Sequence, residues 1–198
     1  MTRWVLAAAA MVLGAGCGVV EPAAYPEAPP WQAEESEPID VVNTFALRTD
    51  SGTAVVLHVT SSEILGPDVS LERFVEGSGV SIRGRAFGRP VDLEAHDGVV
   101  QGIIDGRPVS LAVERHDSAI HFDGIVRAEP SSFAIGARAA QGTIARCSYE
   151  LTRVELGYEG RRSCGGPSAH VWLRLPMALD SWGDEERAAV LAILLGGR

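Results

Sequence analysis

The sequence predicts an all-β domain in residues 41–175, an antiparallel meander of short hairpins that can close into a small barrel, followed by one C-terminal α-helix. Three observations support this prediction. Short apolar runs are separated by Gly, Pro, Asp, Asn or Ser throughout the region. Apolar and polar residues alternate within runs such as residues 109–114, as in a strand with one buried face. A motif of glycine and proline also recurs along the chain, which indicates a repeated structural unit.

The strands are predicted in chain order from the turn residues that bound them. The domain opens with "VVNTFALR", "TDSG" and "TAVVLHVT", a hairpin whose turn contains Gly52. Further runs predict strands at "VSLERF", "GVSIRG", "PVDLEA", "GVVQGII", "PVSLAVER", "AIHFDGIV", "SFAIGARA", "GTIARCSYEL", "RVELGY" and "HVWLRL". Short strands with such regular turns are typical of an antiparallel sheet or barrel.

The recurring motif reads Gly-x-x-x-Gly-x-Pro-Val. It begins at Gly84 and again at Gly102, with a decayed copy at Gly124 and a trace at Gly142. The leading glycines lie 18, 22 and 18 residues apart, so each unit has room for a hairpin. A parallel β-solenoid repeats at a similar length and is the alternative architecture.

The turn chemistry favours hairpins over the solenoid. Asp-Gly at positions 97–98 and 105–106 is a preferred dipeptide of type I′ turns, which connect antiparallel strands. Pro90 and Pro108 follow turns, where a missing N–H need not break the sheet. The repeat is therefore explained mainly by folding.

The final segment, residues 176–198, predicts a helix from about Gly183 to Leu195. Ser181 and Asp184 have the spacing of a capping box, and acidic residues fill the first turn. Glycines at 196–197 provide a stop. The second half, "AVLAILL", is apolar all round, so it must bury against the sheet, a partner or a lipid surface. We expect the helix to dock on the sheet or to plug one barrel end.

Residues 1–16 have the features of a signal peptide. One Arg precedes the apolar run "WVLAAAAMVLGAG", which is shorter than the roughly 20 residues that a membrane-spanning helix needs. With the Cys that follows, the segment resembles the signal peptide of a bacterial lipoprotein, although Gly14 stands where that class has an aliphatic residue. The resemblance implies that Cys17 is lipidated and becomes the mature amino terminus. Ordinary secretion is the alternative.

Residues 17–40 are expected to form a tether. Positions 21–38 hold five Pro and five Glu, a composition that cannot bury a core and extends by self-repulsion. These features predict a protein of the cell envelope, lipid-anchored to the membrane and facing the periplasm or the cell exterior. In such an oxidising space Cys147 and Cys164 are expected to form a disulfide.

Composition and missing motifs exclude several functions. All 17 basic residues are Arg, which rules out a P-loop, a lysine Schiff base and a Ser-Lys dyad. The net charge of −9 gives no electrostatic reason to bind nucleic acid. No nucleophile-elbow, zinc-protease or dinucleotide-binding motif is present in the sequence. We therefore predict neither a catalytic site nor a cofactor.

Two His-Asp pairs, His96-Asp97 and His116-Asp117, are the candidate metal ligands. In a meander both pairs fall at the same end of the sheet, separated by two strands or about 10 Å. Two imidazoles, each held by a carboxylate, could then bind a divalent metal. The alternative interpretation is that each Asp occupies a turn position beside a solvated His.

The opposite end of the sheet is expected to present arginines. Arg89 and Arg107 come from the two "GRP" turns, with Arg85 and Arg127 nearby. They could receive an anionic ligand or an acidic partner. In so acidic a chain, solvated turn charges are the alternative.

The leading functional hypothesis is a lipid-anchored envelope protein whose β-domain has a structural or protein-binding role and no enzymatic activity. An envelope protein is the expected partner. One alternative is a small barrel that binds an apolar ligand. The other is a metal-binding domain that uses the His-Asp turns.

Overall fold

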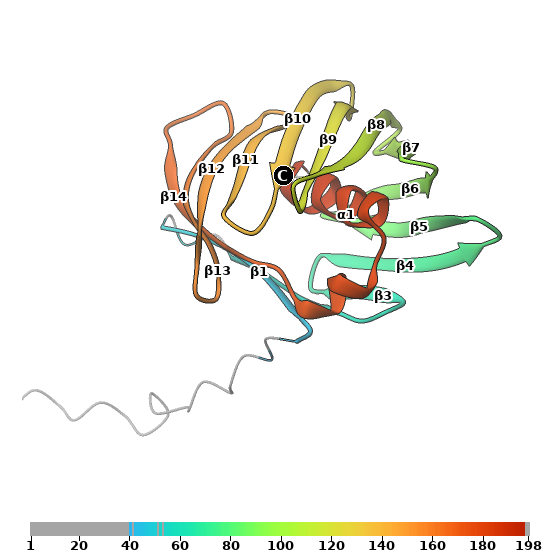
Figure 1. Ribbon diagram of the computed structural model, residues 1–198, viewed down its shortest axis with the longest axis horizontal. Coiled ribbons are helices and arrows are strands. Elements are labelled where there is room, and N and C mark those ends of the chain that lie inside the picture. The colour runs from blue at the N-terminus through green and yellow to red at the C-terminus, as the bar shows by residue number, and fades with distance from the viewer. Residues whose placement is uncertain (1–39, 41, 51, 53, 197–198) are drawn as a thin grey trace, which may run out of the picture. The chain divides into compact units, whose positions relative to one another are not determined.

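A computed structural model describes residue 40, residues 42–50, residue 52 and residues 54–196. These residues form fourteen strands in one closed antiparallel barrel (Figure 1). The strands are β1 (Thr44–Thr49), β2 (Ala54–Val59), β3 (Glu63–Gly66), β4 (Val69–Glu76), β5 (Gly79–Ala86), β6 (Arg89–His96), β7 (Val99–Ile104), β8 (Arg107–His116), β9 (Ala119–Val126), β10 (Glu129–Ile135), β11 (Ala139–Ile144), β12 (Cys147–Val154), β13 (Gly157–Ser163) and β14 (Ala169–Arg174).

The meander prediction is confirmed, and the solenoid alternative is wrong. Each strand pairs with its neighbours in sequence, and β1 closes the barrel by pairing antiparallel with β14. The barrel is larger than the small one expected. The turns at 97–98 and 105–106 have positive φ at both central residues, between 50° and 77°, as type I′ turns require.

Four strand predictions were wrong in detail. The run "SFAIGARA" spans the turn between β10 and β11. The run "GTIARCSYEL" was predicted as one strand but contains β11 and β12, which are separated by a turn at Ala145 and Arg146. The run "RVELGY" spans the turn between β12 and β13. The short strand β3 was not predicted. Apolar runs locate strands well only where Gly, Asp, Asn or Pro marks the turn, and the pair at 145–146 has none of these.

The leading glycines of the repeat are needed where neighbouring strands approach closely. Gly84, Gly102, Gly124 and Gly142 have φ between 122° and 149°. A Cβ at Gly102 would lie 2.1 Å from the carbonyl oxygen of Asp92 on the adjacent strand, and the other three positions have equivalent contacts at 2.1 to 2.2 Å. Glycine kinks of this kind bend a sheet so that it can close.

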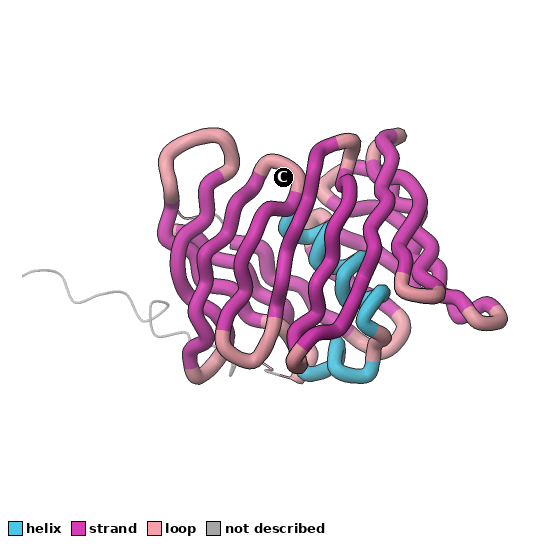
Figure 2. The backbone as a smooth tube through the Cα atoms, turned by 45° about the horizontal axis from the view of Figure 1, so that its top comes forward, coloured by secondary structure: helices cyan, strands magenta, loops and turns pink. Residues whose placement is uncertain are grey.

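Helix α1 (Asp184–Gly196) runs through the inside of the barrel (Figure 2). Residues 188–195 are at most 2% exposed, and they are apolar on every side. The helix packs against β5–β9 and β11. A barrel of this many strands is too wide for side chains alone to fill, so the helix completes the core. The helix thus packs against the sheet, as one of the two expected placements requires, but from inside the barrel and not as a plug at one end.

Acidic residues hold the amino-terminal end of α1. Asp184 forms an ion pair with Arg115. Arg73 donates from Nε to Glu186 Oε2 over 2.6 Å, and the two side chains are partly buried. This hydrogen bond raises the pKa of Arg73. Carboxylates in the first turn also interact favourably with the helix dipole.

The chain enters the barrel through a 3₁₀ helix, η2 (Met177–Ser181). The capping-box expectation was wrong, because the Ser181 hydroxyl donates to the Ala178 carbonyl within η2. Trp182 then donates from its indole nitrogen to the Thr60 carbonyl over 3.1 Å. The helix itself begins one residue later than predicted and ends one residue later.

The carboxyl-terminal end of α1 is held by side chains of the barrel wall. The Tyr149 hydroxyl donates to the Leu195 carbonyl over 2.8 Å, and Arg127 Nη1 donates to the Gly196 carbonyl over 3.4 Å. Burial raises the pKa of Tyr149 to about 12, although the neighbouring Arg162 opposes the shift. These donors satisfy carbonyls that lack partners within the helix.

The predicted disulfide is confirmed. Cys147, the first residue of β12, is bridged to Cys164, which follows β13, across 17 positions of sequence. A loop of this length contributes about 3 kcal/mol in the chain-entropy model. Within the described part of the chain, no helix is both long and apolar enough to span a membrane.

The substitution Gly102→Ala is expected to lower the free energy of unfolding by about 3 kcal/mol and the Tm by roughly 6–12 °C. The added Cβ would clash with the Asp92 carbonyl in a backbone conformation that already disfavours alanine. The matched control is Gly106→Ala, at a positive φ with no atom within 4 Å, which should cost about 1 kcal/mol. Thermal denaturation measures both, and equal losses would mean that the close approach of the strands is not responsible.

The raised pKa of Tyr149 predicts a loss of stability at alkaline pH. The unfolded tyrosine ionises near pH 10 and the folded one near pH 12, so the contribution is complete below pH 10 and is lost as the pH rises to 12. The loss should reach about 2–3 kcal/mol. Tyr149→Phe removes this dependence while lowering stability at neutral pH by about 1 kcal/mol. Urea titrations of both proteins at each pH test the prediction, and parallel pH profiles would contradict it.

Candidate functional site

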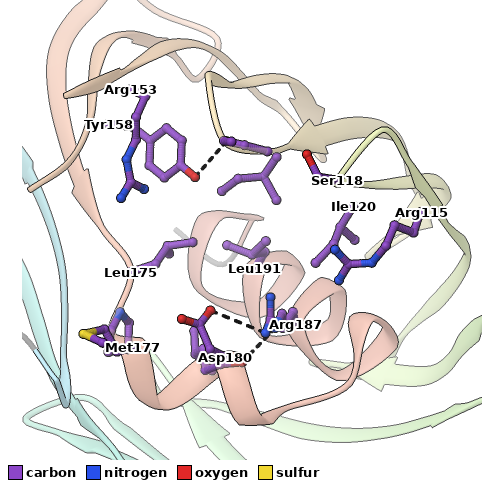
Figure 3. A pocket seen from close by; sticks show the side chains of 15 residues that line it. Arg115, Ser118, Ile120, Arg153, Tyr158, Leu175, Met177, Asp180, Arg187 and Leu191 are labelled. Carbon is purple, nitrogen blue, oxygen red and sulfur yellow. Dashed lines mark hydrogen bonds and ion pairs between the residues drawn. The ribbon is translucent and has the colours of Figure 1, made fainter. Parts of the chain in front are cut away.

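A hollow of about 260 Å³ opens at the end of the barrel where α1 begins (Figure 3). We call it the mouth pocket. Its apolar lining is formed by Ile120 on β9, Ile135 on β10 and Leu191 on α1, together with Leu179 on η2. Ile120 and Ile135 alternate with more exposed residues on their strands, so the pattern that builds the core also builds part of the pocket floor. Since α1 occupies the interior, the pocket is confined to the barrel mouth.

Charged side chains form the rim of the mouth pocket, and most are already bound. Arg187 donates from Nε to the Leu179 carbonyl over 2.7 Å, and its Nη2 lies 3.4 Å from Asp180 Oδ1. Arg115 is paired with Asp184. These interactions hold both side chains in place and pair each guanidinium group with a carboxylate, so neither is readily available to an anionic ligand.

Arg153 differs from the other rim arginines. No carboxylate within the described residues forms an ion pair with it. Its guanidinium carbon lies 5.0 Å from the centroid of the Tyr158 ring, which faces it across the β12–β13 hairpin. The Tyr158 hydroxyl donates to the Gly136 carbonyl over 3.0 Å, which fixes the ring (Figure 3). The pocket therefore combines an apolar floor with one positioned, uncompensated cation.

The sequence did not single out Arg153 or Tyr158. They oppose each other only because β12 turns into β13 at Glu155 and Leu156. That turn was hidden inside a run predicted as a strand. Recognising it would have placed the two side chains opposite each other, but not beside α1.

The His-Asp turns are separate features of the same barrel end. His96 ends β6, with Nδ1 3.6 Å from Asp97 Oδ2. His116 ends β8, and its Nε2 lies 2.8 Å from Glu114 Oε2, not beside Asp117. All four predicted ligands are at least partly exposed.

The register of the strands keeps the two turns apart. His96 pairs with Val99, and Val99 pairs with Ala112 on β8. His116 lies four residues further along β8, about 13 Å beyond the level of His96. Among the described residues, no group of three or more His, Cys, Asp or Glu side chains could hold a metal ion. The expected convergence of His96, Asp97, His116 and Asp117 is not found.

The arginine end of the sheet is arranged as expected in part. Arg89, Arg107 and Arg127 line one hollow at the barrel end opposite the mouth pocket. Arg85 does not line it and donates instead to the Gly88 carbonyl over 2.6 Å. The predicted lipidation site, Cys17, lies outside the described residues.

Comparison with known proteins gives no functional guide, because no protein-family model, curated protein or solved structure matches the chain.

Proposed function

We propose that this chain is a lipid-anchored cell-envelope protein whose barrel binds a small amphipathic anion without transforming it. The observation that carries the binding proposal is the uncompensated Arg153 above the apolar floor of the mouth pocket. An acyl or aryl group would contact Ile120, Ile135 and Leu191. Its carboxylate would pair with Arg153.

The size of the mouth pocket limits the ligand. Small-molecule sites usually enclose about 300–1,000 Å³, and the mouth pocket is slightly smaller at about 260 Å³. A ligand of about ten non-hydrogen atoms, or the end of a longer chain, fits that space. A small apolar ligand held inside the barrel, the alternative considered from the sequence, would need the interior that α1 fills.

The non-enzymatic part of the proposal rests on the chemistry of the lining. Among the described residues, the mouth pocket contains no His or Cys, and its only carboxylate, Asp180, is near Arg187. Ser118 therefore has no general base within the lining. The arrangement suits binding and orientation of a ligand.

The envelope part of the proposal rests on the sequence. The signal-peptide pattern, the Cys at position 17 and the Pro/Glu-rich composition of residues 17–40 support a lipid anchor followed by an extended tether. The confirmed disulfide is consistent with an oxidising compartment. A tethered barrel would hold its ligand close to the membrane surface.

Protein binding is the second candidate function. Phe74 and Val75, near the end of β4, are 39% and 64% exposed. Exposed apolar side chains at a hairpin tip can contact a partner protein. This surface is separate from the mouth pocket, so the two functions can be tested independently.

Isothermal titration with octanoate tests the ligand proposal. We expect the full chain to bind octanoate and Arg153→Gln to weaken that binding by about tenfold, because a charge-assisted hydrogen bond is lost. Octanol, which has no charge, should bind both proteins equally. The matched control is Arg161→Gln, an exposed arginine on β13 that does not line the pocket. Failure of octanoate to bind, or equal effects of the two substitutions, would refute a site centred on Arg153.

Intact-mass spectrometry of the protein purified from its own membrane tests the anchor. We expect a mature chain that begins at Cys17 and carries an acyl adduct, with a gain of about 2 Da on reduction as the disulfide opens. The variant Cys17→Ser should lack the adduct. A mature chain that begins beyond Cys17 without lipid would show ordinary secretion and leave the ligand proposal unaffected.

A further inference from the structure

Four arginines surround a hollow of about 290 Å³ at the barrel end where α1 finishes. We call this the arginine hollow. Its lining comprises Arg89, Arg107, Arg127, Arg146, Glu129, Ala145 and Gly196. Five of these seven residues carry charged side chains, in contrast to the largely apolar floor of the mouth pocket at the other end.

The hairpin repeat delivers these side chains to one place. Arg89 is the first residue of β6 and Arg107 the first residue of β8. Both stand five positions after a leading glycine of the repeat, at Gly84 and Gly102. Alternate strands of an antiparallel sheet begin at the same end, about 10 Å apart. Closure of the barrel turns these starting residues toward a common opening.

The third and fourth units place two more arginines beside them. Arg127 lies in the turn between β9 and β10, and Arg146 in the turn between β11 and β12. Glu129 takes the first strand position that arginine holds in the earlier units. The hollow is therefore formed at four neighbouring turns of one barrel end, which are separated from one another by two strands of sequence.

Positive charge exceeds negative charge in the arginine hollow. Asp105 is shared loosely, with Oδ2 3.7 Å from Arg89 Nε and 3.9 Å from Arg127 Nη2. Glu129 lies 2.8 Å from Arg146 Nη2. Within the described residues no ion pair involves Arg107. Among the described residues that line the hollow, Glu129 is the one carboxylate beside four guanidinium groups.

Arg127 is the most enclosed member of the group. Its side chain is 16% exposed, and its Nε is buried without a hydrogen-bond partner among the described residues. Burial, followed by the charges of Arg89 and Arg107, lowers the pKa of Arg127. The Gly196 carbonyl accepts one weak hydrogen bond from it, at 3.4 Å. A bound anion would offset the repulsion and provide the missing acceptor.

We propose that the arginine hollow binds a phosphoryl group. Guanidinium groups match the paired oxygens of phosphate, and several arginines around one opening favour an anion with many oxygens. The phosphoryl group could belong to a lipid headgroup or to a free phosphate compound. This site requires neither the anchor nor the ligand of the mouth pocket, because it lies at the opposite end of the barrel.

Titration calorimetry of the full chain at low ionic strength tests this inference with two probes. Pyrophosphate represents free phosphate compounds. Glycerophosphoglycerol is the water-soluble headgroup of phosphatidylglycerol and represents lipid. Sodium chloride of matched ionic strength is the reference. Binding of glycerophosphoglycerol would assign a lipid headgroup, and binding of pyrophosphate alone would assign a free phosphate compound.

Two arginine variants locate the binding. Arg107→Gln should weaken binding of the probe by about fivefold or more, because it removes an exposed arginine that forms no ion pair with a carboxylate in the described part of the chain. The matched control Arg85→Gln removes the same charge near the same barrel end but outside the hollow, and should change affinity by less than about twofold. Thermal denaturation verifies that both variants fold. If neither probe binds more tightly than chloride, or if the two variants weaken binding equally, the arginine hollow is not a phosphoryl site.

Discussion

The packing of α1 inside the barrel is the interaction on which the rest of the structure depends. A closed sheet of this size has a lumen that inward-facing side chains cannot fill, and a helix that is apolar on every side cannot remain in water. The helix therefore fills the lumen of the barrel, and the barrel shields the apolar helix from water. The two ends of the helix make polar contacts with the barrel wall. Arg73 and Arg115 bind the amino-terminal end. Tyr149 and Arg127 bind the carboxyl-terminal end. The helix is held at both ends as well as along its length.

The same packing decides where ligands can bind. Because α1 fills the interior, the mouth pocket and the arginine hollow lie at the two barrel ends. Further hollows of about 530 and 570 Å³ lie along the barrel wall between β9 and β12. The two hollows at the barrel ends differ because the helix ends differ. Near the amino-terminal end, acidic helix residues neutralise Arg115 and leave Arg153 as the available cation. Near the carboxyl-terminal end, the described helix residues offer backbone carbonyls, of which that of Gly196 accepts a hydrogen bond from Arg127.

The hairpin repeat serves the scaffold and also places charge. Its leading glycines are required because neighbouring backbones approach too closely for a Cβ. Its first strand positions carry Arg89 and Arg107, which line the arginine hollow. A repeat shaped by backbone geometry thus brings similar side chains together at one barrel end. The paired His-Asp turns at the other end do not converge, because β8 extends beyond the level at which β6 ends.

The sequence by itself determined the local structure: the hairpins with Asp-Gly turns, the helix to within one residue at each end, and the pairing of Cys147 with Cys164. The turns and the helix depend on residues that are close together in the chain, and the disulfide depends on the small number of cysteines. Only the tertiary structure decided the pairing of β1 with β14, the enclosure of α1, the hidden turn at 145–146, and the meeting of Arg153 with the mouth pocket. These depend on strand number, register and barrel closure, which arise from contacts between distant segments and leave no periodic signal in the sequence.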